Sequence, residues 1–181
     1  RGCAIAFSFL LAGGNSIGVS LAEPVMVGVA RRIIDVALST DCKLCLPKEV
    51  VVAVEFKLGA THRIAKIDDV ADGEMILDAG PEAIAAAGGF LQACATTVWN
   101  GPMGAFEIPP FDAATTALAK IVAAETQNNG MMSVAGGGDT MAALANAGVN
   151  DQFSYVSTAG GAFLEWLEGN RLPGVEALIN G

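Results

Sequence analysis

Apolar and polar positions alternate between helical and strand-like spacing along this chain of 181 residues. Apolar residues at helical spacing predict helices at 4–12, 24–38, 83–87 and 112–125. Short apolar or β-branched runs predict strands at 43–46, 50–56, 75–78, 96–99, 131–135 and 155–157. The polar stretch 57–73 is expected to form a surface excursion. This alternation indicates an α/β domain with a largely parallel sheet, in which ligands bind beyond the carboxyl ends of the strands.

The composition narrows the class of protein. Residues are 52% hydrophobic and 16% charged, and the net charge is −9. The acidic balance argues against nucleic acid and anionic membranes as partners.

The charge-free runs 2–22 and 83–106 contain glycines and polar residues, so neither supplies the roughly 18 unbroken apolar residues of a spanning helix. The first run also imitates a signal peptide, which is the less favoured interpretation. Because the chain opens on Arg1, we expect sequence upstream of it.

The cysteines include a CxxC pair, Cys42 and Cys45. This spacing suits a redox pair or half of a zinc site. A zinc site would need two more ligands, and a redox pair usually opens a helix, whereas this one runs into Pro47 and a predicted strand. Buried or half-buried free thiols in a reducing compartment are therefore expected.

The most informative motif is the run Val134-Ala135-Gly136-Gly137-Gly138-Asp139-Thr140. Strong helix formers follow at 141–147, so the pattern indicates a strand, a glycine turn and a helix start. Glycines let a phosphate approach the backbone, and the helix start offers unpaired N–H groups to hold it. Asp139 adds a carboxylate suited to Mg²⁺, and Thr140 adds a hydroxyl. The motif therefore indicates chemistry on phosphates.

Three more glycine-bearing turns follow predicted strands, at 78–81, 100–104 and 157–161. All four turns are expected at one edge of one sheet, where they would form a shared site. Neither the Walker loop nor the dinucleotide pattern fits, because no lysine follows the glycines and Met141 replaces the third glycine. No Lys or Arg lies between Lys66 and Lys120, or between Lys120 and Arg171. Phosphates would need backbone N–H groups, a metal and cations from elsewhere, which predicts half of a site.

Several motifs resemble those of the phosphoglycerate kinase family, in the family's order: LDAGP at 77–81, VWNGPMGAFE at 98–107, GGGDT at 136–140, VSTAGGA at 156–162 and LPGV at 172–175. The resemblance covers essentially the whole chain. It implies a Rossmann-like, three-layer α/β fold that is part of the C-terminal, nucleotide-binding domain of a two-domain kinase. It also implies reversible phosphoryl transfer between 1,3-bisphosphoglycerate and Mg-ADP, giving ATP and 3-phosphoglycerate.

The resemblance assigns nucleotide-binding roles to ten residues: Gly2, Leu21, Asn100, Pro102, Glu107, Gly136, Gly137, Gly138, Asp139 and Thr140. Leu21 matches an apolar wall of the adenine pocket, and Glu107 matches a residue that binds the ribose. Gly137 and Gly138 match the catalytic phosphate-binding turn, and Asp139 matches the magnesium side. The cofactor implied is Mg²⁺, with ATP and ADP as substrates.

The resemblance also implies a division of the chain. Residues 1–154 match an N-terminally incomplete nucleotide-binding domain, and 155–181 match a hinge-proximal segment and C-terminal tail. Thr158, Gly160 and Gly161 match the hinge region. The domain that binds 3-phosphoglycerate is absent from this span, so the chain alone is expected to bind Mg-nucleotide weakly and to turn over nothing. Its tail, 171–181, is expected to be mobile or misplaced, and the intact enzyme to be monomeric and cytoplasmic.

The chain departs from the family's pattern at three positions, where Cys3 and Ile76 replace glycines and Tyr155 stands where many members have histidine. Two alternatives stay open at this point. One is a Rossmann-type, NAD-binding oxidoreductase domain. The other is a non-catalytic, degenerate fragment that keeps the fold and binds no nucleotide.

Overall fold

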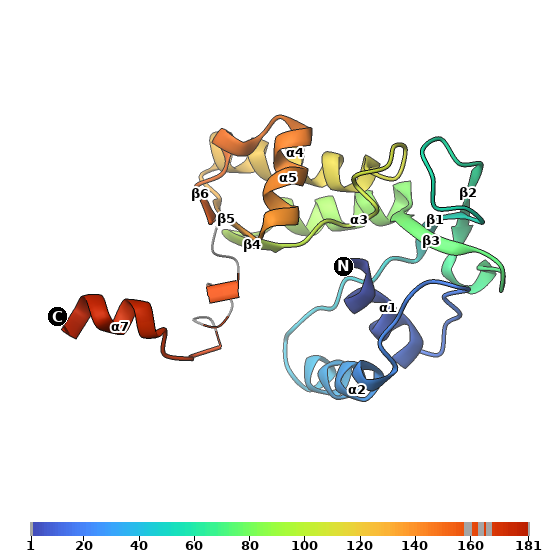
Figure 1. Cartoon of the computed structure of the whole chain (residues 1–181), viewed down its shortest axis with the longest axis horizontal. Coiled ribbons are helices and arrows are strands. Elements are labelled where there is room, and N and C mark those ends of the chain that lie inside the picture. Colours follow the sequence, from blue (N-terminus) through green and yellow to red (C-terminus); the bar gives the residue numbers. More distant parts are fainter. Residues whose placement is uncertain (1, 158–160, 163–164, 166–167, 181) are drawn as a thin grey trace.

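The computed structural model describes residues 2–157, 161–162, 165 and 168–180. Its helices are α1 (Gly2–Ala12), α2 (Pro24–Ser39), α3 (Pro81–Gln92), α4 (Ala113–Asn129), α5 (Gly138–Ala147) and α7 (Pro173–Asn180). Its strands are β1 (Glu49–Ala53), β2 (His62–Lys66), β3 (Met75–Ala79), β4 (Thr96–Asn100), β5 (Met132–Gly136) and β6 (Tyr155–Ser157). In this part of the chain the strands form two three-stranded sheets (Figure 1).

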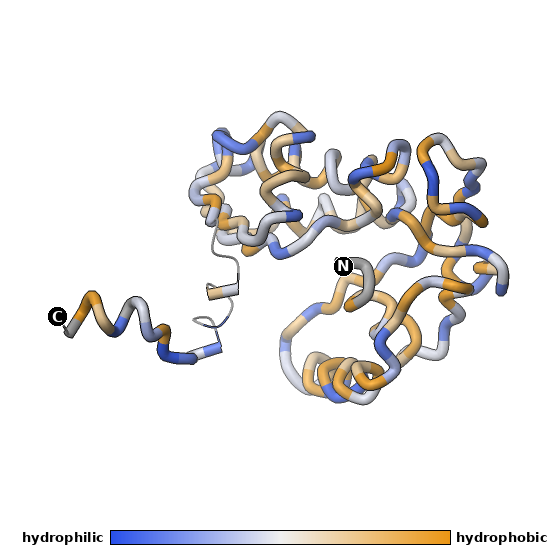
Figure 2. The backbone as a smooth tube through the Cα atoms, viewed as in Figure 1, coloured by the Kyte–Doolittle hydropathy of each residue, from blue (hydrophilic) through white to orange (hydrophobic). Residues whose placement is uncertain are grey.

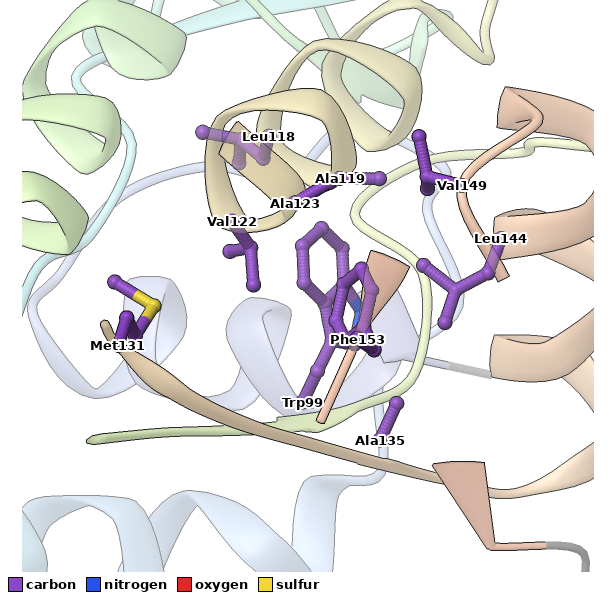
Figure 3. Packing of buried hydrophobic residues seen from close by; sticks show 10 residues of the cluster. All are labelled: Trp99, Leu118, Ala119, Val122, Ala123, Met131, Ala135, Leu144, Val149 and Phe153. Atoms are coloured by element: carbon purple, nitrogen blue, oxygen red, sulfur yellow. The ribbon is translucent and has the colours of Figure 1, made fainter. Parts of the chain in front are cut away.

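The parallel sheet has the order β4-β5-β6. Parallel neighbours need crossover connections, and α4 links β4 to β5 while α5 links β5 to β6. The α/β class predicted from the sequence is therefore confirmed. Figure 3 shows the core that these elements share, in which Trp99 from β4 meets Phe153 edge to face at 6.3 Å between ring centroids. Val122 from α4 and Leu144 from α5 also belong to it, and both are fully buried.

The second sheet is antiparallel, with the order β2-β1-β3. Phe7 and Leu10 of α1 pack against Val50 and Val52 of β1, and α2 contacts α1 (Figure 1). The turn at 78–81 follows β3 and so belongs to this sheet, while two of the other turns follow β4 and β5. The prediction that all four turns share one sheet edge is therefore wrong. The fourth turn lies in part outside the described residues, at 158–160.

Two local expectations also differ from the structure. Residues 43–46 form no strand, because this extended segment pairs with no strand in the described part of the chain. Residues 62–66, expected within a surface excursion, form the edge strand β2. Arg63 on β2 forms ion pairs with Glu74 at 2.7 Å and Asp69 at 2.9 Å. Antiparallel pairing with β1 along its whole length holds this charged sequence in an extended conformation.

The described cysteine side chains are more exposed than the sequence predicted. Cys42, Cys45 and Cys94 are free thiols, as expected, but all three are exposed rather than buried.

The helix α7 stands apart from the rest of the chain in Figure 1, and Figure 2 shows apolar residues near its outer end. Leu178 and Ile179 of this helix are exposed. Among the described residues, no helix is long and apolar enough to cross a membrane.

Candidate functional site

A cavity of about 530 Å³ lies between α1, the segment 19–21, β3 and the loop that follows β4. Its volume is within the range typical of small-molecule pockets. Apolar side chains such as Phe7, Ile76 and Phe106 form much of its wall. Glu107 and Asp139 supply carboxylates to the lining. The cavity therefore combines an apolar wall with two acidic groups, one from the loop after β4 and one from the first turn of α5.

Four of the ten predicted nucleotide-binding residues line this cavity: Leu21, Pro102, Glu107 and Asp139. They come from three segments that are distant in sequence, and only the fold brings them together. Gly2 is the first residue of α1, the helix that also supplies Phe7 to the wall. The remaining predicted residues lie at the carboxyl ends of β4 and β5 and in the first turn of α5: Asn100, Gly136, Gly137, Gly138 and Thr140.

Parallel pairing aligns the ends of β4 and β5, because Asn100 is the register partner of Gly136. The two following turns consequently lie side by side. The Gly101 N–H donates to Thr140 Oγ1 at 2.8 Å, which ties the first turn to the start of α5. The Gly101 carbonyl accepts from the indole N–H of Trp99, also at 2.8 Å. Trp99 is thus buried with its N–H satisfied.

Glycine is required at the turn into α5. Gly137 precedes the helix with a φ of +101°, a conformation that other L-residues rarely adopt. The first helical hydrogen bond runs from the Met141 N–H to the Gly137 carbonyl. The N–H groups of Gly138, Asp139 and Thr140 therefore have no acceptor within the helix, which is the geometry that binds anions. The sequence reading of this motif as strand, turn and helix start is confirmed.

Asp139 is the residue whose chemistry suits a divalent cation. Its exposed carboxylate lies in the first turn of α5 and reaches the cavity. The described residues contain no group of three or more His, Cys, Asp or Glu side chains that could hold a metal ion. A single carboxylate fits Mg²⁺ only when a ligand supplies further oxygens, as Mg²⁺ commonly binds through one or two carboxylates together with substrate phosphates.

Hydrogen bonds fix the loop after β4 at two further points. The Met103 N–H donates to Thr115 Oγ1 at 3.0 Å, and the Ala105 N–H donates to the Leu77 carbonyl at 2.8 Å. The loop therefore bridges α4 and β3. This explains how Pro102 and Glu107 are both held at the cavity wall.

Several lining residues were not singled out from the sequence. Phe7 and Met75 line the cavity, but each stands in an apolar run that is typical of core. Phe56, which lies between two charged residues, also lines the cavity. Ile76, noted as a departure from the family's pattern, is 7% exposed and forms part of the wall. No local signal separates such residues from packing residues, because their role depends on the cavity that the fold creates.

The predicted hinge lies largely outside the described residues. Thr158 and Gly160 are not described, while Gly161 is described and exposed. Tyr155 is exposed on β6, directly before this segment.

An α/β domain with an apolar cavity beside a glycine-rich helix start has the architecture of a nucleotide-binding domain. The sequence profile of the family described as "Phosphoglycerate kinase" matches residues 2–170. The chain therefore belongs to the phosphoglycerate kinase family.

Relatives named phosphoglycerate kinase support this assignment. The chain is 55% identical to the protein from Rhodospirillum centenum over 177 residues, which cover 98% of this chain and 45% of that relative. It is also 55% identical to the protein from Zymomonas mobilis, again covering 45% of that relative. The chain thus spans less than half the length of these relatives.

Solved structures agree on the fold. The structure of phosphoglycerate kinase from Coxiella burnetii superimposes with a TM-score of 0.90 at 44% identity, covering 96% of this chain and 44% of that one. The phosphoglycerate kinase from Pyrococcus horikoshii gives a TM-score of 0.75 at 24% identity, and this similarity supports the fold alone.

The contact between Gly101 and Thr140 can be tested by the substitution Thr140→Val. Valine keeps the β-branched shape but offers no acceptor, so the Gly101 N–H loses its partner. We expect the free energy of unfolding to fall by about 1–2 kcal/mol in urea denaturation followed by circular dichroism. Thr61→Val at an exposed position is the matched control and should stay within about 0.5 kcal/mol of wild type. A Thr140→Val protein as stable as wild type would contradict the account.

Proposed function

We propose that this chain is the C-terminal, nucleotide-binding portion of a phosphoglycerate kinase and that its cavity binds Mg-ADP and Mg-ATP. The observation that carries this proposal is the convergence of Leu21, Pro102, Glu107 and Asp139 on one cavity. Each was a candidate from the sequence, and they come from three separate segments. The family match over residues 2–170 supports the same ligand class.

The cavity offers each part of a nucleotide a suitable environment. The base would contact the apolar walls, to which Leu21 and Phe106 contribute. Glu107 is exposed at the cavity and its carboxylate can accept hydrogen bonds from ribose hydroxyls. The phosphates would lie at the start of α5, near Asn100, where Gly137 allows close approach. This order follows the positions of the residues around the cavity.

We assign the catalytic contribution of this chain to Gly137 and Gly138. Backbone N–H groups aimed at a transferring phosphoryl group stabilise the charge that spreads over its oxygens. Asp139 would hold Mg²⁺ together with phosphate oxygens, and the ion would neutralise charge on those oxygens. Thr140 supports this turn from behind through its contact with Gly101.

From the distribution of cations we infer that activity requires a longer protein. No Lys or Arg lies between Lys66 and Lys120, so the loop after β4 carries no cation of its own. In the intact enzyme the remainder of the chain would supply the cations and bind 3-phosphoglycerate. We propose a monomeric, cytoplasmic enzyme with residues 1–154 in the nucleotide domain and 155–181 in a hinge-proximal segment and tail. Within it, Thr158, Gly160 and Gly161 belong to the hinge.

The family match favours neither alternative that the sequence left open. An NAD-binding oxidoreductase would require the dinucleotide glycine pattern, whose third position is Met141 here. A degenerate fragment would bind no nucleotide, and the following experiment separates it from our proposal.

Asp139→Asn tests the proposed magnesium contact. We expect the substitution to weaken Mg-ADP binding to this chain about tenfold in isothermal titration calorimetry, because one charged metal ligand is lost. Binding of ADP in EDTA should change much less, since the carboxylate then meets no cation. Asp151→Asn, at an exposed acid in a short 3₁₀ turn after α5, is the matched control. No binding by wild type would favour the degenerate alternative, and equal Mg-ADP affinities of wild type and Asp139→Asn would contradict the proposed magnesium contact.

The second expectation concerns turnover. Wild-type chain is expected to bind Mg-nucleotide weakly and to form no ATP from 1,3-bisphosphoglycerate and Mg-ADP, because the cations that meet the transferring group lie outside it. A coupled assay with a full-length phosphoglycerate kinase as the positive control measures this. ATP formation that scales with the concentration of the purified chain would contradict the expectation.

A further inference from the structure

Asp78 is a buried carboxylate for which the proposed function has no use. It is the penultimate residue of β3 and is 1% exposed. Among the described residues, it is the charged side chain that the fold buries, since the other buried polar residues are Ser and Thr. Burying a carboxylate costs free energy unless hydrogen bonds compensate for the lost water. Its contacts therefore call for an explanation.

Two backbone N–H groups satisfy this carboxylate. Asp78 Oδ2 accepts from the Ala114 N–H at 2.9 Å, and Oδ1 accepts from the Ala79 N–H at 2.9 Å. Ala114 lies in the first turn of α4, whose own N-cap residue, Asp112, makes no side-chain capping bond. Asp78 thus caps α4 from a strand 36 positions earlier.

The same carboxylate supports the loop that lines the nucleotide cavity. A Cβ atom at Gly104 would lie 2.2 Å from Asp78 Oδ1 and 2.6 Å from the Phe111 carbonyl oxygen. Gly104 is therefore held between Asp78 and the backbone before α4, with no room for a side chain. The next residue, Ala105, donates its N–H to the Leu77 carbonyl at 2.8 Å. Leu77 thus ties this part of the loop to β3, and the Asp78 carboxylate packs closely against it.

The loop contacts the cavity on its other side. Gly104, together with Pro102 and Glu107, lines the nucleotide cavity, whereas Asp78 does not. Asp78 instead borders a separate cavity of about 30 Å³ with apolar neighbours, which include Phe7 and Met103. The carboxylate therefore lies directly behind the wall that would contact the nucleotide.

We propose that Asp78 is a positioning residue for nucleotide binding, which holds the Gly104 loop so that Pro102 and Glu107 reach the nucleotide. This inference rests on the proposed function. Asp78 itself touches no ligand and acts through the loop. Removal of its charge would weaken the bonds to the Ala79 and Ala114 N–H groups that fix the carboxylate behind Gly104, and the wall that Gly104 forms would lose this support.

The surroundings of Asp78 shift the pKa of its carboxyl, so nucleotide affinity should depend on pH. Burial raises the pKa of the Asp78 carboxyl to about 7, while the N–H groups of Ala114 and Ala79 act in the lowering direction. Asp112, before α4, is the charged group that faces it and raises the pKa further. Its neighbours from α1, β1 and the loop are apolar: Phe7, Leu10, Val50 and Met103. Protonation converts one acceptor oxygen into a donor, so one of the two N–H contacts weakens.

Asp78→Asn in the 181-residue chain is the direct test. An amide of the same size presents an NH₂ group to one of the two backbone donors. We expect Mg-ADP affinity at pH 8 to fall about tenfold by calorimetry. Asp72→Asn is the matched control, because Asp72 is exposed and lies outside the cavity lining. Circular dichroism verifies that each variant is folded.

Two further readouts distinguish positioning from a general loss of stability. Wild-type affinity should fall between pH 8 and pH 6 by more than the titration of the ADP phosphate causes, and Asp78→Asn should lose this excess. Gly104→Ala displaces the same contact from the loop side, because the added Cβ would lie 2.2 Å from Asp78 Oδ1. It should also weaken Mg-ADP binding, and the double variant should lose less than the sum of the two.

The outcomes separate this inference from the proposed function. If wild type binds no Mg-ADP, both fail. If wild type binds with the expected dependence on Asp139 but folded Asp78→Asn keeps both the affinity and the pH profile, only the role of Asp78 is overturned. Should Asp78→Asn not fold, an unchanged Mg-ADP affinity in Gly104→Ala overturns that role. Reduced affinity in Gly104→Ala with the excess pH dependence lost supports it.

Discussion

The in-register pairing of β4 with β5 is the constraint on which the candidate site depends. Because Asn100 pairs with Gly136, two glycine turns leave the sheet side by side, and the hydrogen bond from Gly101 to Thr140 joins them. A shift of one residue would reverse the faces that the side chains occupy and remove Trp99 from the core. The core around Trp99 and Leu144 therefore also sets the geometry at the cavity.

The helices and strands predicted most reliably are those in which the local pattern of residue types matches their burial in the fold. The strand within 96–99 and the glycine turn into α5 were recognisable, because β-branched runs, glycine positions and helix formers are local signals. The pairing of β3 with β1 was not predictable in this way, since antiparallel partners are chosen by contacts between distant segments. The strand β2 was missed because its exposed, charged sequence lacks an apolar pattern and its support is the pairing with β1, which joins segments apart in the sequence.

The residues of the candidate site likewise divide into those that the sequence identified and those that it did not. Residues with distinctive chemistry, such as Glu107 and Asp139, could be proposed from the sequence, and the structure places both at one cavity. The apolar walls could not, because Phe7 and Met75 stand in apolar runs and look like ordinary core positions until the fold is known. Asp78 is an intermediate case: its motif was recognised, but its burial behind the cavity loop appears only in three dimensions.

The apolar cavity, the start of α5 and the scarcity of nearby cations support one proposal: the chain forms half of a phosphoryl-transfer site. A crystal structure of the chain grown with Mg-ADP tests it most directly. The account predicts the diphosphate at the backbone N–H groups of Gly138 and Asp139, with the base against Leu21. Density for ADP away from both the cavity and the start of α5 would contradict it.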